Sequence, residues 1–386
     1  MSSTASIDKL LSTAVANGDV PNVVAVAADR DGIVYEGAAG PRAVGSPDAA
    51  SADTHFRIMS MTKMVTTTAA LQLADLGRLE LDAPVERYRP EFADVKVLTG
   101  FDGDTPQLRA PASQATVRQL MTHTSGLSYW FWNSDIVKWE ATTGIPNVLA
   151  GQEIVFTAPM IADPGTRVEY GTNTDWLGRV VEAVSGLTLD KYFAEHITGP
   201  LGMTETSFAP TAAQRANLAP IHVLDEDGKW VASDINIPEK PEYWTGGHGL
   251  YSTPHDYLKF QRMLLGGGTF DGTKILDAST VDAAFTNQIG ALTFPEHIAT
   301  ADPASSHDLD LGPGYKWGLG LLLNGEQAPG MRAAGSGTWA GLCNSFFWVD
   351  RETGVTGAIF SQSLPFVPPP FMKLYADFER ALYAAL

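Results

Sequence analysis

Strand-like and helical patterns are distributed unevenly along this 386-residue chain, and that distribution limits the folds open to it. Residues 60–290 contain mostly helical runs and long Gly/Pro loops, with no βαβ alternation. The strand-like segments are 23–27, 33–35, 317–323, 331–334, 346–350 and 355–360, and the helical runs outside them are 7–15 and 371–386. We therefore expect an α+β fold: an antiparallel β-sheet from both chain ends, flanked by N- and C-terminal helices, with an inserted, mainly α-helical domain.

The same pattern predicts two domains with the active site between them. Residues 1–59 and about 291–386 form the predicted sheet domain, and about 60–290 form the mainly helical one. The segments 99–116 and 293–314 are long for connections within a compact domain. Loops of this length are more often lids or pocket walls, so we predict that role for both.

Composition favours a globular protein and argues against several kinds of partner. A formal net charge of −18 repels nucleic acid and anionic membrane surfaces. No apolar run reaches the roughly eighteen residues of a membrane span and no leader pattern is visible, so we expect a cytoplasmic protein.

The eight His residues show no metal-binding spacing, and neither a metal nor a cofactor is predicted. Cys343 has no partner for a disulfide and is interpreted as a buried structural residue.

Ser60 and Lys63 are the strongest candidates for a reactive pair. Ser60 lies where an extended run ends and a helical run begins, and Lys63 follows one turn later on the same face. The helix expected after Ser60 is amphipathic, with a stripe made of Met64, Val65, Thr68 and Leu71. A hydroxyl beside an amine and unpaired helix N–H groups suits a nucleophile. A second copy of the spacing, Ser6 and Lys9, is interpreted as a helix cap with a solvated charge.

Tyr170 is the candidate proton carrier for such a pair. It follows a Pro-Gly turn at residues 164–167 that delivers it into the next element. Beside a buried ammonium group a phenolate is favoured, so the pKa of Tyr170 is predicted to fall below its usual value near 10. A hydrogen-bonded core tyrosine is the alternative interpretation.

Three ordered motifs connect these residues to a known group of enzymes. Ser60-Met61-Thr62-Lys63, Tyr170-Gly171-Thr172 and Trp339-Ala340-Gly341 resemble the motifs of the serine hydrolases that include class C β-lactamases, penicillin-binding D,D-peptidases and family VIII carboxylesterases. Further segments similar to this group are residues 81–85, 120–127, 200–203 and 246–253. The matches run in order from about residue 20 to residue 360. The resemblance implies a β-lactamase/transpeptidase-like fold.

The resemblance also implies a mechanism for this chain. Ser60 attacks a carbonyl carbon, Lys63 and Tyr170 manage the proton, and Tyr170 passes it to the leaving group. The backbone N–H groups of Ser60 and Leu342 hold the oxyanion, and water releases the acyl group. Which of Lys63 and Tyr170 is the formal base stays open, because the two groups titrate together.

Two departures from the β-lactamase pattern point to esters. Trp339 stands where that pattern has a cation, so a substrate carboxylate loses its charge partner. Thr172 stands where the pattern has Asn, although Asn173 follows one residue later and a bulged backbone would bring it into the site. Both changes favour neutral, apolar acyl esters.

The remaining candidates for substrate contact lie near these motifs. Tyr129 and Trp130 belong to an aromatic cluster, residues 129–132, which is interpreted either as an apolar pocket wall or as core packing. Gly341 and His248 are the other predicted substrate-binding residues, and His248 is alternatively a cap on a glycine turn. His123 is expected to orient its loop through hydrogen bonds.

The leading prediction is a serine carboxylesterase that cleaves short- to medium-chain esters through an acyl-enzyme on Ser60. Its only predicted partner is the small-molecule ester, and the oligomeric state stays open. The alternatives are a β-lactamase, D-amino-acid peptidase or amidase, an acyltransferase, and a catalytically silent binding protein. Retention of Ser60, Lys63 and Tyr170 together argues against the last.

Overall fold

A seven-stranded antiparallel sheet joins the two ends of the chain in the computed structural model, which describes residues 4–386. The strand order is β13-β14-β15-β16-β17-β1-β2, so N-terminal β1 pairs directly with C-terminal β17. The strands are β1 (Val23–Asp29), β2 (Ile33–Ala39), β13 (Lys316–Trp317), β14 (Leu322–Leu323), β15 (Gly337–Gly341), β16 (Ser345–Asp350) and β17 (Val355–Phe360). The prediction of a sheet from both chain ends is confirmed.

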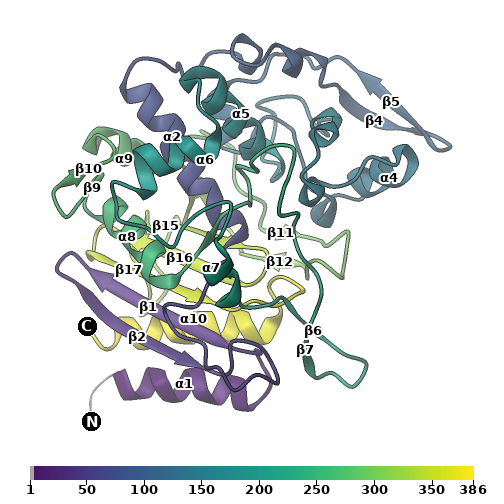
Figure 1. The fold of residues 1–386 in the computed structure, drawn as a ribbon. Coiled ribbons are helices and arrows are strands. Elements are labelled where there is room, and N and C mark those ends of the chain that lie inside the picture. The colour runs from purple at the N-terminus through teal and green to yellow at the C-terminus, as the bar shows by residue number, and fades with distance from the viewer. Residues whose placement is uncertain (1–3) are drawn as a thin grey trace.

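Helices cover both faces of this sheet (Figure 1). The terminal helices α1 (Thr4–Ala16) and α10 (Pro369–Tyr383) pack against each other on one face. On the other face, α8 (Pro254–Leu265) packs on β1 and β17, and the remaining helices lie beyond it. The predicted α+β class with flanking terminal helices is therefore confirmed.

Helix α2 (Thr62–Asp75) is enclosed on all sides, which the predicted amphipathic pattern did not show. Thr66, Thr67 and Thr68 are as buried as its apolar residues, because α5 (Asn173–Ser185) covers what would otherwise be a solvent face. Thr66 Oγ1 compensates its burial by donating to the Gly246 carbonyl at 2.6 Å. The helix that carries Lys63 and follows Ser60 is thus fixed in the centre of the molecule.

The other elements of the middle segment are short helices and hairpins. The α-helices are α3 (Val117–Met121), α4 (Ser134–Thr143), α6 (Leu189–Phe193), α7 (Ala212–Ala216) and α9 (Ala278–Ala284); the 3-10 and π turns are η1 (Met59–Met61), η2 (Val85–Arg87), η3 (Pro90–Asp94), η4 (Trp130–Trp132), η5 (Val148–Ala150), η6 (Glu153–Thr157) and η7 (Ala194–Thr198). The paired short strands are β3 (Phe56–Arg57) with β8 (Tyr251–Ser252), β4 (Val97–Asp102) with β5 (Thr105–Arg109), β6 (His222–Leu224) with β7 (Trp230–Ala232), β9 (Thr269–Phe270) with β10 (Thr273–Lys274), and β11 (His297–Ile298) with β12 (Leu309–Asp310).

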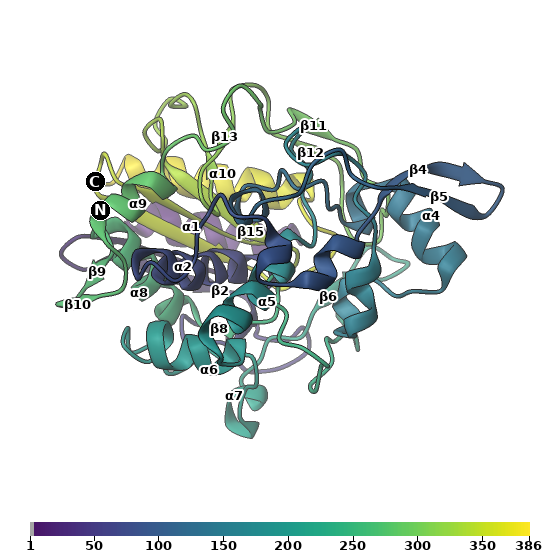
Figure 2. The same cartoon turned by 90° about the horizontal axis from the view of Figure 1, so that it is seen from above.

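Both long segments predicted as loops contain paired strands. The 99–116 segment forms most of the β4–β5 hairpin, which projects far from the chain termini (Figure 2). The 293–314 segment contains the β11–β12 pair. The predicted domain boundaries near residues 59 and 290 stay a prediction.

Two strand predictions near the C-terminal part of the sheet were wrong. Residues 317–323 form two short strands, because the chain turns through Gly318, which approaches the Ala284 carbonyl, and Gly320, with φ +81°. A Cβ on Gly318 would lie 1.9 Å from that carbonyl oxygen, so the turn needs glycine there. Residues 331–334 form a loop, and the strand expected there begins later, as β15.

Among residues 4–386, no helix has both the length and the apolar character needed to cross a membrane.

Candidate active site

Ser60 lies on a tight turn that runs directly into the buried helix α2. This turn, η1, includes Met59, whose φ of +46° is uncommon for a residue with a side chain. The Ser60 side chain stands at the bend and is half-buried. Its position before the first turn of α2 also places it beside helix N–H groups, which favour developing negative charge.

Strand β15 packs against the Ser60 turn, and Gly341 makes the close approach possible. A Cβ atom on Gly341 would lie 2.3 Å from the carbonyl oxygen of Ile58 and 2.4 Å from Ser345 Oγ. Any larger side chain would therefore push the strand away from the turn. The structure gives Gly341 this packing role, where the sequence indicated a substrate contact.

Lys63 follows Ser60 by one helical turn and is almost completely buried, with 1% of its surface exposed. Its Nζ lies 3.1 Å from Ser60 Oγ, 3.0 Å from Tyr129 Oη and 2.9 Å from the Gly247 carbonyl oxygen. Burial lowers the pKa of Lys63 to about 7, because an ammonium group loses its hydration there. A large neutral fraction at neutral pH is the state that an acceptor for the Ser60 proton needs.

The partners of Lys63 also orient its lone pair. A carbonyl oxygen such as that of Gly247 only accepts hydrogen bonds. Tyr129 Oη donates its own proton to Asp175 Oδ2 at 3.3 Å, so this oxygen accepts from Lys63 as well. A neutral amine gives its two hydrogens to these two oxygens, and its lone pair then faces Ser60 Oγ.

Asp175 is a member of this network that the sequence analysis missed. It is fully buried on α5, accepts a hydrogen bond from the Gly247 backbone N–H at 3.0 Å, and its burial raises its pKa. Its negative charge raises the pKa of Lys63 and so opposes part of the burial effect. An Asp in the first turn of a helix ordinarily complements the helix dipole, so its position in the sequence gave no separate signal.

Tyr170 completes the cluster from the segment that leads into α5. Its Oη accepts a hydrogen bond from Trp339 Nε1 at 2.8 Å, and a second hydrogen bond joins it to Ser60. The centroid of its ring lies 4.8 Å from Lys63 Nζ. The structure therefore brings together the three residues predicted to be catalytic.

The predicted fall in the pKa of Tyr170 is wrong, because the pKa is raised. Burial disfavours the phenolate, and this effect exceeds the lowering by the hydrogen bonds with Ser60 and Trp339. The prediction assumed a permanent ammonium group beside the phenol. The same burial lowers the pKa of Lys63 to about 7, which removes much of that charge at neutral pH.

Tyr129 does not line the cavity beside Tyr170, where it was predicted as a pocket wall. Its hydroxyl connects Lys63 to Asp175, and its ring lies edge-on to that of Tyr170 at 5.3 Å. The aromatic cluster drew attention to this residue, but its hydrophobic character gave no sign of the hydrogen bonds.

A cavity of about 370 Å³ opens beside Tyr170. Residues that line it include Ser128, Trp132, Glu169, Tyr170, Phe294 and Ile298. The prediction that the 293–314 segment forms a pocket wall is confirmed. Trp130 points elsewhere: its indole N–H donates to Asp302 Oδ2 at 3.1 Å and so holds this segment in place.

The first residue of the third motif, Trp339, has its indole N–H committed to Tyr170. The side chain is buried among Trp317 and Phe294, with ring centroids at 4.8 and 5.9 Å. A substrate carboxylate would meet neither a cation nor a free N–H at this position. Leu342 follows directly after β15 and is buried. Its role with Ser60 in an oxyanion hole stays a prediction.

The second motif ends in Thr172 and is followed by Asn173, whose side-chain amide forms hydrogen bonds within the protein. Thr172 is buried at the N-terminus of α5, where its side chain makes no capping hydrogen bond. Asn173 donates both amide hydrogens, to the carbonyls of Leu127 and Glu169 at 3.2 Å each, and accepts from Ser125 Oγ at 2.5 Å. The hypothesis that Asn173 reaches a substrate is therefore wrong, because its donors already clamp the loop to the helix.

Two histidines lie close to the cluster without entering the cavity beside Tyr170. His248 is buried with its Nδ1 3.9 Å from Asp175 Oδ1, and burial lowers its pKa to about 3. It lines a separate small cavity with Phe208 and Trp244, so the structure does not place it where a substrate contact was predicted. The ring of His123 packs on Tyr170 at 4.6 Å, and no hydrogen bond is formed by its buried Nδ1.

The residues set aside on sequence grounds lie away from this chemistry. Ser6 and Lys9 are exposed on α1. Cys343 is buried, and burial raises the pKa of its thiol to about 12. In the part of the chain from residue 4 onward, no three His, Cys, Asp or Glu side chains are arranged to hold a metal ion.

Comparisons with known proteins agree with this geometry. The family model described as Beta-lactamase matches residues 7–382. Lovastatin esterase of Penicillium rubens is 33% identical to this chain, over 97% of this chain and 96% of that protein. Monacolin J acid methylbutanoyltransferase of Aspergillus terreus is 32% identical, over 96% of this chain and 93% of that protein.

Solved structures give the same result for the fold. Unliganded simvastatin synthase from Aspergillus terreus superposes with a TM-score of 0.86 at 29% identity, covering all of this chain and 98% of that one. EstCE1, a hydrolase with promiscuous acyltransferase activity, superposes with a TM-score of 0.78 over 99% of this chain and 98% of that one. At 22% identity, the second match supports the fold alone. The fold is β-lactamase/transpeptidase-like, as the resemblance implied.

Proposed function

The chain belongs to the β-lactamase family of serine hydrolases and acyltransferases, and we propose that it is a carboxylesterase acting on neutral esters through an acyl-enzyme on Ser60. One observation carries the proposal. The buried Lys63 amine lies 3.1 Å from Ser60 Oγ, with its other hydrogen-bond positions filled by Gly247 and Tyr129.

Lys63 acts as the base in the first step. Its pKa of about 7 leaves a large neutral fraction at neutral pH, and its lone pair faces the Ser60 hydroxyl. Ser60 Oγ attacks the ester carbonyl carbon while its proton passes to Lys63 Nζ. The backbone N–H groups of Ser60 and Leu342 receive the oxyanion, at the positive end of α2.

Tyr170 supplies the proton for the leaving alcohol. Its raised pKa keeps it a neutral phenol, and the hydrogen bond from Trp339 fixes its oxygen near Ser60. As the carbon–oxygen bond of the ester breaks, Tyr170 protonates the departing alkoxide, and the Lys63 ammonium group restores the proton to Tyr170. Water then attacks the acyl-enzyme along the reverse path and releases the acid.

The surroundings of the pair support an apolar, uncharged substrate. Trp339 offers no charge, and its N–H already binds Tyr170. The adjacent cavity is walled in part by Trp132 and Phe294. A relative, lovastatin esterase, carries an ester substrate in its name, and ester cleavage by this chain agrees with that similarity. Short- to medium-chain acyl esters are the substrate class we assign.

The test uses the two copies of the Ser-x-x-Lys spacing. Ser60→Ala is expected to abolish turnover of p-nitrophenyl butyrate, and Ser6→Ala, an exposed serine with the same spacing to a lysine, is expected to leave it unchanged. A fluorophosphonate label should add its mass to Ser60 in the wild type. Undiminished turnover by Ser60→Ala would remove the proposal.

Acyl transfer to an alcohol is the second candidate. It shares the acyl-enzyme, and two relatives named as methylbutanoyltransferases match 96% and 86% of the chain. The near-dry setting of Lys63 and Tyr170, which are 1% and 6% exposed, favours an acceptor that displaces water. Product analysis with an added alcohol distinguishes the two: an excess of new ester over free acid identifies a transferase.

A chromogenic cephalosporin tests the amide-cleaving alternative, and turnover comparable to that of the ester would favour it.

A further inference from the structure

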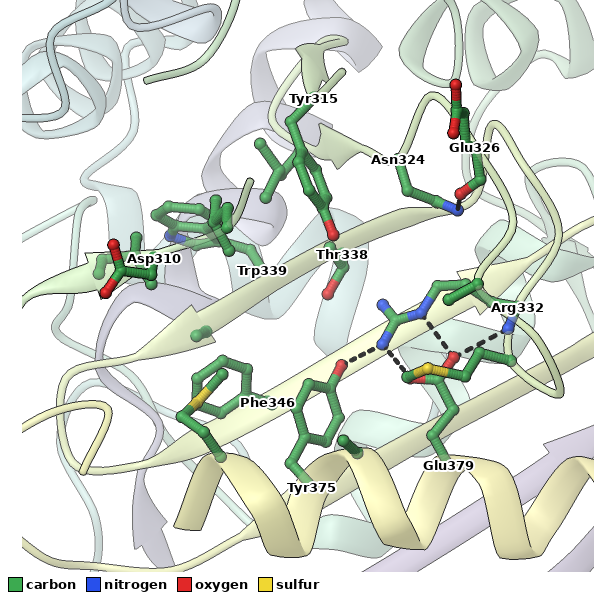
Figure 3. A pocket seen from close by; sticks show the side chains of 18 of the residues that line it. Asp310, Tyr315, Asn324, Glu326, Arg332, Thr338, Trp339, Phe346, Tyr375 and Glu379 are labelled. Atoms are coloured by element: carbon green, nitrogen blue, oxygen red, sulfur yellow. Dashed lines mark hydrogen bonds and ion pairs between the residues drawn. The ribbon is translucent and has the colours of Figure 1, made fainter. Parts of the chain in front are cut away.

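A second cavity, of about 250 Å³, lies between the β14–β15 part of the sheet, α10 and the loop after β14 (Figure 3). Its apolar wall includes Leu309, Leu311, Leu322, Phe346, Phe366 and Met372. Neither Ser60, Lys63 nor Tyr170 lines it. Trp339 forms part of its wall, and the same indole donates to Tyr170, so this tryptophan contacts both the cavity and the candidate active site.

A buried guanidinium group lies at the base of this cavity. Arg332 is 8% exposed and pairs with Glu379 of α10 through its backbone N–H and Nε, both at 2.9 Å to Oε1, and through Nη2 to Oε2. Nη2 also donates to Tyr375 Oη at 2.6 Å. This network fixes the guanidinium plane against α10.

One nitrogen of this group has no partner. Within residues 4–386 no acceptor meets Arg332 Nη1, and Figure 3 shows this nitrogen, without a dashed line, directed into the space between Thr338, Tyr375 and Trp339. This nitrogen is open to the cavity, so a ligand acceptor of suitable shape can take its hydrogen bond in place of water. The cavity therefore has a largely apolar body, with the guanidinium donor of Arg332 on the side of α10 and the Tyr315 hydroxyl group also in its lining.

The charges around the cavity select the kind of acceptor. Glu379 neutralises Arg332, and the carboxylates of Glu326 and Asp310 stand at the exposed rim. An anionic ligand would meet more negative than positive charge, and both oxygens of Glu379 already accept hydrogen bonds from Arg332, so the base offers no site for a cation. A neutral carbonyl oxygen satisfies Nη1 without adding charge.

We propose that this cavity binds a small, neutral, largely apolar molecule with its carbonyl oxygen on Arg332 Nη1. Its volume is somewhat below the range of about 300–1,000 Å³ typical of ligand pockets, so the occupant is a compact molecule such as an aryl ketone or a small lactone. The aromatic rings of Phe346, Phe366 and Tyr375 suit a planar apolar body.

Calorimetric titration of the wild-type enzyme with four matched probes tests the chemistry. Acetophenone carries the carbonyl, ethylbenzene has nearly the same shape without an acceptor, and benzoate and benzylammonium carry opposite charges. Acetophenone is expected to bind at least about tenfold more tightly than each of the others, because only it satisfies Nη1 without a charge. Equal binding by ethylbenzene, or tighter binding by either ion, would overturn the proposal, as would no binding of acetophenone.

Two matched substitutions locate the site. Ala376→Phe fills this cavity from α10 and is expected to abolish acetophenone binding, whereas Ala299→Phe fills the cavity beside Tyr170 and is expected to leave it intact. Ala328→Phe, on the exposed loop after β14, repeats the first test if Ala376→Phe does not fold. Loss of binding in Ala299→Phe alone would place the ketone at the active site and overturn the proposal. Because acetophenone is not an ester, the outcome is independent of the proposed esterase activity.

Discussion

Tyr129 Oη lies 3.0 Å from Lys63 Nζ and accepts a hydrogen bond from it. The phenol proton goes to Asp175, so the hydroxyl group joins a buried base to a buried acid through a single oxygen atom. This arrangement fixes the direction of the lysine lone pair without placing a carboxylate in direct contact with the amine. The orientation of the base thus depends on a residue that never touches the substrate in the proposed mechanism.

Tyr129→Phe is expected to lower kcat about tenfold or more while KM changes little, because Lys63 loses the acceptor that fixes one of its hydrogens. Tyr243→Phe is the matched control. That residue is also a buried tyrosine close to Asp175, but its hydroxyl makes no hydrogen bond. Steady-state kinetics with p-nitrophenyl butyrate measures both variants. A larger loss in Tyr243→Phe than in Tyr129→Phe would contradict the positioning role.

The pH dependence of kcat/KM should show an acidic limb with its midpoint near the Lys63 pKa of about 7. Activity rises with pH through this value, because deprotonation of Lys63 produces the base. Asp175→Asn is expected to move the midpoint to lower pH, since the carboxylate charge raises the pKa of Lys63 and the amide carries no charge. The amide oxygen can still accept from the Gly247 N–H, whereas the amide NH2 group cannot accept the Tyr129 proton, so kcat is expected to fall as well. A midpoint that stays in place or rises would contradict the assignment of this limb to Lys63.

The sheet and the proximity of the three candidate catalytic residues were predictable from the sequence for different physical reasons. The pairing of β1 with β17 follows from the strand-like runs near both chain ends, since neither end alone forms a complete sheet. Ser60, Lys63 and Tyr170 were found through ordered motifs. The single strand expected over 317–323 failed because two glycines allow a turn within an apolar run.

The electrostatics of the site could not be obtained from the sequence. The raised pKa of Tyr170 and the lowered pKa of Lys63 both arise from burial, which depends on how α2, α5 and β15 enclose the site. Asp175 lies far from Lys63 in the sequence and belongs to no motif. Only the fold brings its carboxylate close enough to raise the pKa of Lys63. The same applies to Arg332, which the sequence placed in a strand and the structure places in a loop facing α10.

Trp339→Phe is expected to lower kcat for esters about tenfold, because Tyr170 loses the N–H that fixes its oxygen. The phenyl ring retains most of the packing against Trp317, so stability should change by less than about 1.5 kcal/mol. The pKa of Tyr170 should rise further, since the hydrogen bond from Trp339 lowers it. Kinetics and thermal unfolding measured together separate the two effects. A loss of stability with unchanged kcat would assign Trp339 to packing alone.

Gly341→Ala tests whether the contact between β15 and the Ser60 turn governs activity. The added Cβ would stand 2.3 Å from the Ile58 carbonyl oxygen, and the backbone there cannot move without shifting the turn. We expect a loss of about 1–3 kcal/mol in the free energy of unfolding, together with a fall in kcat of about a hundredfold from displacement of Ser60. Gly32→Ala is the control, because a Cβ there meets nothing within 4 Å and its φ is not positive. Urea unfolding and ester turnover of both variants give the comparison, and full activity in a folded Gly341→Ala would show that the position of Ser60 does not depend on this contact.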